Sequence, residues 1–247
     1  MDQIITRHRH ELKRRVLTVT ETCRITPNMI RITLQSDDLG DFVSLGPDDH
    51  VKLFFQGDGD KPEMRDYTPR AFDTAARTLT LDFAVHGEGP AQEWAEAAKP
   101  GDLLHIGGPR GSAVVAPVFD WYLLIGDETA LPAIGRWIEE MPAGTHVTSL
   151  ATVESEAEQQ QFDTAATHQP IWVHRPLNLA ADPAPLLQAL RQITLPPGKG
   201  FIWIAAEAGV ARAARDHVLS ELGHPKEWLK ASGYWLLGES DAHQPLD

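Results

Sequence analysis

The side chains best suited to chemistry lie in one short segment, residues 64–72, which reads Met-Arg-Asp-Tyr-Thr-Pro-Arg-Ala-Phe. Alternate side chains of a strand share a face, so Arg65 and Tyr67 should point one way and Asp66 and Thr68 the other. A tyrosine can lie against a large flat ring, and a guanidinium can bind a diphosphate through two hydrogen bonds. This combination suits FAD, although a half-exposed strand without a ligand has a similar composition.

A glycine-rich segment, residues 86–94, is the second candidate for ligand binding and reads His-Gly-Glu-Gly-Pro-Ala-Gln-Glu-Trp. Pro90 suits the first position of a helix, and Gly89 lets the backbone approach a ligand closely. Unpaired N–H groups at a helix N-terminus are a natural binding site for a diphosphate. We expect this helix both to bind the diphosphate and to cover one end of the preceding β structure.

The elements that must position these residues differ between the two halves of the chain. Short segments rich in β-branched and aromatic residues, separated by turns, occupy residues 16–20, 29–35, 51–55, 79–85 and 103–106. Residues 79–85 alternate apolar and polar side chains, as a strand with one buried face does. The first half therefore predicts an antiparallel β-barrel, residues 1–116, that binds FAD.

The second half, residues 117–247, alternates apolar runs with helical stretches, a pattern typical of an open, parallel α/β sheet. Ligands of such sheets bind beyond the carboxyl ends of the strands. Two strand ends are candidates: residues 126–132, where Thr129 offers a hydroxyl, and residues 206–209, which contain Glu207 and Gly209. Neither is a glycine fingerprint or a P-loop, but their order after a flavin-type barrel indicates a nicotinamide-binding domain.

Composition excludes several classes of protein. The formal charge of −13 over 247 residues argues against a nucleic-acid partner. The basic residues between Arg7 and Arg15 fit a solvated start of the first strand better than a contact for an anionic ligand. No apolar run is long enough to span a bilayer and no export signal is present, so we expect a cytoplasmic protein. The only cysteine, Cys23, excludes an internal disulfide framework, and no histidine spacing indicates a metal site.

Six ordered blocks carry a resemblance to a known family. They lie at residues 25–34, 50–55, 65–70, 86–94, 126–132 and 207–212, and Gly-Tyr-Trp at residues 233–235 follows them. On these motifs the chain resembles the siderophore-interacting proteins, FAD-dependent ferric-siderophore reductases of the ferredoxin–NADP reductase superfamily. The resemblance covers about 210 residues, nearly the whole chain.

The resemblance implies roles for individual residues. Arg65 would face the FAD diphosphate, Tyr67 the ribityl chain or ring, and Thr68 the reactive edge of the isoalloxazine. The residues expected to bind cofactor are Arg65, Asp66, Tyr67, Thr68, Arg70, Phe83, Val85, His86, Gly89, Pro90, Ala91, Trp94, Thr129, Glu207 and Gly209. The residues expected to bind substrate are Lys52, Arg110, Lys230 and Trp235. No catalytic side chain and no protein metal ligand is expected, because the flavin would transfer the electrons.

One position departs from the family pattern. The family usually has a basic residue after Tyr-Trp, whereas Leu236 and Leu237 follow Trp235 in this chain. Lys230 could replace that residue from a few positions upstream. With one cation fewer, a hydroxamate or mixed-ligand siderophore is a more plausible substrate than a highly charged tris-catecholate.

The implied activity is reduction of siderophore-bound Fe(III) to Fe(II) with electrons from NAD(P)H, by a protein that we expect to be a monomer. Glu154 and Glu156 favour NADH, since an acidic side chain repels a 2′-phosphate, but a solvated acidic loop explains them equally well. Reduced ferredoxin is an alternative electron donor. Two other functions stay open: a general NAD(P)H:flavin oxidoreductase that serves a partner protein, and a carrier that binds ferric siderophores without flavin.

Overall fold

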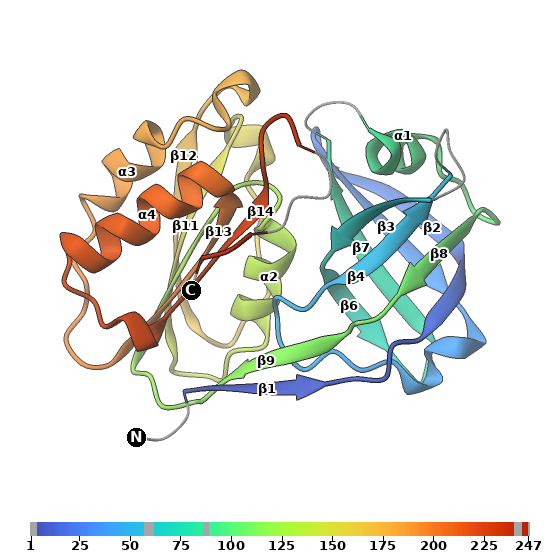
Figure 1. Cartoon of the computed structure of the whole chain (residues 1–247), viewed down its shortest axis with the longest axis horizontal. Coiled ribbons are helices and arrows are strands. Elements are labelled where there is room, and N and C mark those ends of the chain that lie inside the picture. Colours follow the sequence, from blue (N-terminus) through green and yellow to red (C-terminus); the bar gives the residue numbers. More distant parts are fainter. Residues whose placement is uncertain (1–3, 57–61, 86–88, 240–243, 247) are drawn as a thin grey trace. The chain divides into compact units, whose positions relative to one another are not determined.

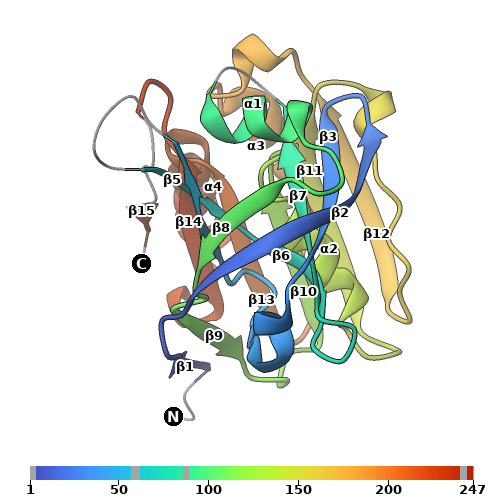
Figure 2. The same cartoon turned by 90° about the vertical axis from the view of Figure 1, so that its right-hand side faces the viewer.

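The computed structural model describes residues 4–56, 62–85, 89–239 and 244–246. The chain forms two compact units (Figures 1 and 2). One unit spans Ile5–Val115, and the other begins at Ala116 and includes Ile4. Each unit has a sheet and a hydrophobic core of its own.

The unit Ile5–Val115 is built on a seven-stranded sheet whose strand pairs are all antiparallel. In spatial order its strands are β5 (Glu63–Tyr67), β4 (Val51–Phe55), β8 (Leu103–Gly107), β2 (Arg14–Thr26), β3 (Met29–Gln35), β7 (Thr78–Ala84) and β6 (Pro69–Asp73). Only Thr68 separates the two edge strands β5 and β6, so the sheet must curl until its edges approach each other. This curled antiparallel sheet confirms the barrel-type fold predicted from the sequence.

The barrel core follows from the alternation of apolar residues along the strands. Leu79, Leu81 and Phe83 of β7 are fully buried, whereas Thr78 and Thr80 are half-buried. The helix α1 (Pro90–Ala97) adds Ala91 and Ala95 to the same core. A separate antiparallel ribbon, not expected from the sequence, pairs β1 (Ile5–Arg9) with β9 (Gly111–Val115), and the 3₁₀ helix η1 (Asp37–Asp41) follows β3.

The second unit contains a six-stranded sheet in which the first five strands are parallel. In spatial order its strands are β12 (Thr167–His174), β11 (His146–Val153), β10 (Trp121–Gly126), β13 (Gly200–Glu207), β14 (Leu229–Trp235) and the antiparallel β15 (Gln244–Pro245). The helices are α2 (Leu131–Glu139), α3 (Ala184–Leu190) and α4 (Ala208–Ser220), with short 3₁₀ turns at Glu156–Glu158, Leu177–Leu179 and Lys226–Trp228. The helix α2 covers one face of this sheet, and α3 and α4 cover the other (Figure 1).

Helices on both faces explain why the central strands are apolar on both sides. Leu123 and Ile125 of β10 belong to the core beneath α3 and α4, whereas Tyr122 packs against Trp137 of α2 at a ring distance of 6.0 Å. Every residue of β13 is buried. The open parallel α/β architecture predicted for this half is therefore confirmed, although β14 was not recognised because Lys230, Ser232 and Gly233 interrupt its apolar pattern.

Among the described residues, no helix is both long and apolar enough to cross a membrane. Within the same part of the chain, no group of three or more His, Cys, Asp or Glu side chains could hold a metal ion.

Candidate functional site

The register of β5 against β4 decides which way the Arg-Asp-Tyr-Thr motif faces. Tyr67 is opposite Val51 and Arg65 is opposite Leu53, and both partners are fully buried in the barrel core. Directly opposite residues of an antiparallel pair lie on the same face of the sheet. The prediction that Arg65 and Tyr67 share a face is confirmed, and that face is the one that carries the core.

Three aromatic rings meet on this face. The ring of Tyr67 lies 4.5 Å from that of Phe83 in β7, and Phe83 lies 5.6 Å from Trp94 of α1. Burial raises the pKa of the Tyr67 hydroxyl, and the smaller effect of the Arg65 charge opposes this shift. Tyr67 therefore stays neutral at physiological pH. Phe83 is fully buried and the rings are tilted against one another, so the partly exposed Tyr67 and Trp94 are the rings of this cluster that a flat ligand can contact.

Arg65 is held by groups of its own strand. Its guanidinium donates one hydrogen bond to the carbonyl of Met64 over 2.8 Å and another to the Glu63 carboxylate over 3.0 Å. The carboxylate is exposed, so this ion pair is weak and exchangeable. An incoming diphosphate can take the place of Glu63 without leaving a buried charge unpaired.

The start of α1 is a helix end of the kind at which phosphate groups bind. Gly89 is the N-cap residue at φ +146°, a conformation that side chains rarely adopt, and a Cβ atom there would meet nothing within 4 Å. Within the described part of the chain, no side chain caps this helix. The partial positive charge of the helix end is therefore open to an anion on the side where Gly89 has no side chain.

Arg70 and Thr68 are buried next to an ion-pair cluster. Arg31 donates two hydrogen bonds of 2.7 Å to the buried carboxylate of Asp82. Arg70 approaches the same carboxylate to 3.7 Å. The cluster links β3, β7 and β6 next to Thr68, the residue between the edge strands β5 and β6. The sequence motif did not indicate this structural role of Arg70.

The other residues predicted for this unit lie in different surroundings. Asp66 forms an ion pair of 3.0 Å with Lys52, and the two lie on the outer face of the sheet, opposite to Arg65 and Tyr67. Arg110 is exposed, and its carbonyl accepts a hydrogen bond from the backbone of His10. Val85 packs against the barrel core, whereas His86 lies outside the described residues.

In the second unit, one carboxylate joins three strand ends. Asp127 follows β10 and accepts hydrogen bonds from the backbone and hydroxyl of Thr129, at 2.9 and 2.5 Å. It also accepts one from the backbone of Glu207 at the end of β13, over 2.9 Å. The indole of Trp235, at the end of β14, donates a further bond of 2.9 Å. Thr129, Glu207 and Trp235 are therefore brought together, by a residue that was not among the predicted site residues.

The neighbouring acids are also engaged. Glu207 caps α4, because its side chain accepts hydrogen bonds from the backbones of Gly209 at 2.6 Å and Val210 at 3.0 Å. Glu128 is buried and forms a two-bond ion pair with Arg175, at 2.5 and 3.2 Å. These contacts hold both side chains in place, and Arg175 offsets the negative charge of Glu128 that would otherwise repel a diphosphate.

Lys230 does not join this group. It pairs with Trp203 near the amino end of β14, whereas Trp235 ends the strand. Five residues of extended chain place their Cα atoms roughly 16 Å apart. Lys230 therefore lies well away from Leu236 and Leu237 along the chain, and its replacement of the missing basic residue stays a prediction.

Family models match both units. The model of the siderophore-interacting protein matches residues 119–238, and that of the siderophore-interacting FAD-binding domain matches residues 18–62 and 56–113. The NADPH-dependent ferric-chelate reductase of Escherichia coli K12 is 33% identical over 93% of this chain and 95% of its own length. The chain belongs to the siderophore-interacting protein family.

Other siderophore-interacting relatives agree with this assignment. The ferric vibriobactin reductase ViuB of Vibrio cholerae is 28% identical over 92% of this chain and 91% of its own length. The crystal structure of a siderophore utilization protein from T. fusca superposes with a TM-score of 0.89 at 37% identity. The superposition covers 96% of this chain and 98% of the T. fusca chain.

The described residues fit the FAD that the siderophore-interacting family implies. An aromatic surface, an arginine with an exchangeable partner and an uncapped helix start at Gly89 belong to one unit, the one matched by the FAD-binding model. They match the flat ring and the diphosphate of this cofactor.

Proposed function

We propose that this chain is an FAD-dependent ferric-siderophore reductase, which uses NAD(P)H to reduce chelated Fe(III) to Fe(II). The observation that carries the proposal is the shared face of Arg65 and Tyr67, with Phe83 and Trp94 beside Tyr67, inside the matched FAD-binding domain. The overall reaction consumes one NAD(P)H and two Fe(III) chelates and yields NAD(P)⁺, a proton and two Fe(II). FAD, when bound, supplies the conversion of a two-electron donor into one-electron steps.

The side chains of the barrel bind and orient this cofactor in the proposed enzyme. Arg65 would hold the diphosphate in place of Glu63, and the backbone N–H groups of Gly89 and Ala91 would donate to it as well, with Pro90 fixing the helix start between them. Tyr67 packs against the flavin, and its neutral hydroxyl adds no negative charge there. Thr68 is buried near Arg70 and lies between the edge strands β5 and β6, where its hydroxyl offers a hydrogen bond.

In the α/β unit, Thr129, Glu207 and Trp235 are the proposed contacts for nicotinamide or substrate. Asp127 holds all three in place. The arrangement supports a rigid binding edge, because the three residues that donate to Asp127 follow or end three different strands: Thr129 follows β10, Glu207 ends β13 and Trp235 ends β14.

The proposal also covers the substrate class, the oligomeric state, the cellular location and the electron donor. The E. coli and V. cholerae relatives carry the names of a ferric-chelate reductase and a ferric vibriobactin reductase, so a ferric siderophore is the proposed substrate. Leu236 and Leu237 in place of a basic residue favour a hydroxamate or mixed-ligand complex. A monomer in the cytoplasm, where NAD(P)H is available, completes the proposal, with reduced ferredoxin as an alternative donor.

An anaerobic absorption experiment tests the function. The FAD-loaded protein is mixed with NADH or NADPH, and then with a ferric hydroxamate siderophore and a ferrous-iron trap. The reductase predicts that the flavin band bleaches with the donor and returns as trapped Fe(II) appears. The donor with the faster bleaching is the physiological nicotinamide; the NADPH-dependent E. coli relative and the acidic Glu154 point in opposite directions on this choice.

Other results would replace the proposal. Flavin that bleaches but ignores every ferric chelate would indicate a general flavin oxidoreductase. A protein that takes up no FAD but binds the ferric siderophore would be a carrier.

A further inference from the structure

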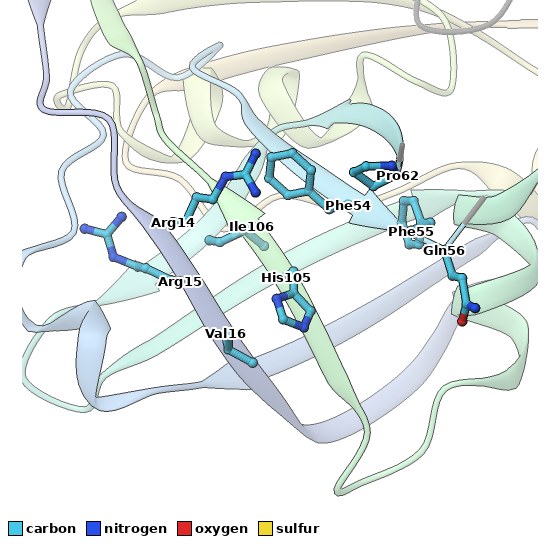
Figure 3. A pocket seen from close by; sticks show the side chains of 9 residues that line it. All are labelled: Arg14, Arg15, Val16, Phe54, Phe55, Gln56, Pro62, His105 and Ile106. Carbon is cyan, nitrogen blue, oxygen red and sulfur yellow. The ribbon is translucent and has the colours of Figure 1, made fainter. Parts of the chain in front are cut away.

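A hollow of about 340 Å³ lies on the outer face of the barrel sheet and has no role in the proposed reaction (Figure 3). Its wall residues come from the three adjacent strands β2, β8 and β4, together with Gln56 and Pro62. They include Arg14, Val16, His105, Phe54, Gln56 and Pro62. The volume is at the lower end of the ~300–1,000 Å³ range of small-molecule sites.

The strand register explains the shape of this hollow. Val16, His105 and Phe54 stand directly opposite one another across three strands, so their side chains share the outer face. In the next row, Arg14 is opposite Gly107. A Cβ atom on Gly107 would come within 3.1 Å of the Phe54 ring, so the missing side chain lets this ring lie close to the sheet. Arg14 covers the ring from outside, with its guanidinium carbon 4.5 Å from the ring centroid.

Three polar side chains around this hollow are available to a ligand. Arg14, His105 and Gln56 are exposed, and within the described part of the chain none of them has a hydrogen-bond or ion-pair partner. Arg15 lines the same hollow but uses its three guanidinium nitrogens on the carbonyls of Asp38 and Gly108 and on the Asp41 carboxylate. Among the described residues that line the hollow, Arg14 therefore provides the one guanidinium that is available to a ligand.

We propose that this hollow binds a small aromatic carboxylate. Phe54, Val16 and Pro62 provide apolar contacts for a flat ring, and the stacking on Phe54 orients the Arg14 fork for a carboxylate. A single available guanidinium matches a monoanion, whereas a phosphate or a polyanion would require more cations. His105 and Gln56 can each bind a polar substituent of the ring.

The hollow is separate from the flavin face. Phe54 is opposite Met64 on the outer side of β4 and β5, whereas Arg65 is opposite the core residue Leu53 on the inner side. A ligand in the hollow and FAD can therefore bind together, and the inference does not depend on the proposed reductase activity.

Isothermal titration of the full-length, FAD-loaded protein with 2-naphthoate tests the proposal, with neutral 2-naphthamide as the matched probe. We expect 2-naphthoate to bind with a submillimolar Kd, at least about tenfold more tightly than the amide, because only the carboxylate can accept two hydrogen bonds from Arg14. Arg14→Gln should remove this preference. Phe54→Leu should weaken 2-naphthoate and cyclohexanecarboxylate alike, because it removes the ring that holds the Arg14 fork in place.

The control is Arg191→Gln, which removes an exposed arginine from the other unit and should bind 2-naphthoate as the wild type does. Thermal melts show whether the Arg14 and Phe54 variants are folded. The proposal is overturned if 2-naphthoate does not bind, if Arg14→Gln binds it as tightly as the control, or if the probe releases FAD, which would place it in the flavin site.

Discussion

The indole nitrogen of Trp235 donates a hydrogen bond to Asp127 over 2.9 Å, and this contact joins the ends of β14 and β10 although β13 lies between them. The same carboxylate oxygen accepts the backbone N–H of Glu207, the last residue of β13. One acidic side chain thus sets the relative positions of the strand ends at which we expect nicotinamide or substrate to bind.

Replacing Asp127 by alanine should destabilise the α/β unit. The backbone N–H of Glu207 and the indole N–H of Trp235 would both lose this acceptor, and an unmet buried donor costs ~1–3 kcal/mol. We expect the free energy of unfolding, measured in urea, to fall by about 2–4 kcal/mol. The matched control is Asp216→Ala, which removes an exposed carboxylate of the same unit that pairs with Arg215 and should change stability by less than about 0.5 kcal/mol. Equal effects of the two substitutions would refute the anchoring role of Asp127.

Glu128 should make the stability of the protein depend on pH. Burial and the Asp127 charge raise the pKa of this carboxyl above 4.5, and Arg175 only partly offsets them. A raised pKa means that the folded state binds the proton more tightly than the unfolded state, so the contribution of Glu128 to stability is fully present below about pH 4.5 and is lost as pH rises through the raised value.

The test compares urea unfolding of the wild type and Glu128→Gln at several pH values from 4.5 upward. Subtracting the two curves cancels the contribution of the other titrating groups. The wild type should lose stability relative to Glu128→Gln as pH rises, whereas Glu221→Gln, an exposed control, should run parallel to the wild type. Parallel curves for Glu128→Gln would contradict the raised pKa.

Local patterns predicted those parts of the fold that depend on neighbouring residues in the chain. Alternation over residues 79–85 identified β7, and period-two geometry placed Arg65 and Tyr67 on one face. Contacts between residues that are distant in the sequence, and that only the order of the strands brings together, could not be predicted from such local patterns. In the sequence, Asp127 is only an acidic residue that would repel a diphosphate. Its role as an acceptor for Glu207 and Trp235 follows from the sheet, which places the three residues together. Similarly, only the register of β4 and β5 reveals that Lys52 pairs with Asp66 on the outer face.

The double substitution Arg65→Ala and Tyr67→Ala should weaken FAD binding several-fold. It removes the guanidinium proposed for the diphosphate and the ring that packs beside Phe83. Quenching of FAD fluorescence on titration gives the Kd directly. Arg77→Ala is the control, because it removes an exposed arginine of the same unit that pairs with Asp37. An unchanged Kd for the double variant would place the cofactor elsewhere.

Replacing Glu63 by glutamine should strengthen FAD binding, because the Glu63 carboxylate competes with the diphosphate for Arg65. Exposed ion pairs contribute ~0.2–1 kcal/mol, so the Kd should fall by a factor of about 1.4 to 5. The gain should shrink in 1 M salt, where the screening length is only about 3 Å. Glu21→Gln, which neutralises an exposed carboxylate on β2, should leave the Kd unchanged at either salt concentration. A Kd that stays the same or rises in Glu63→Gln would mean that Arg65 does not exchange Glu63 for the cofactor.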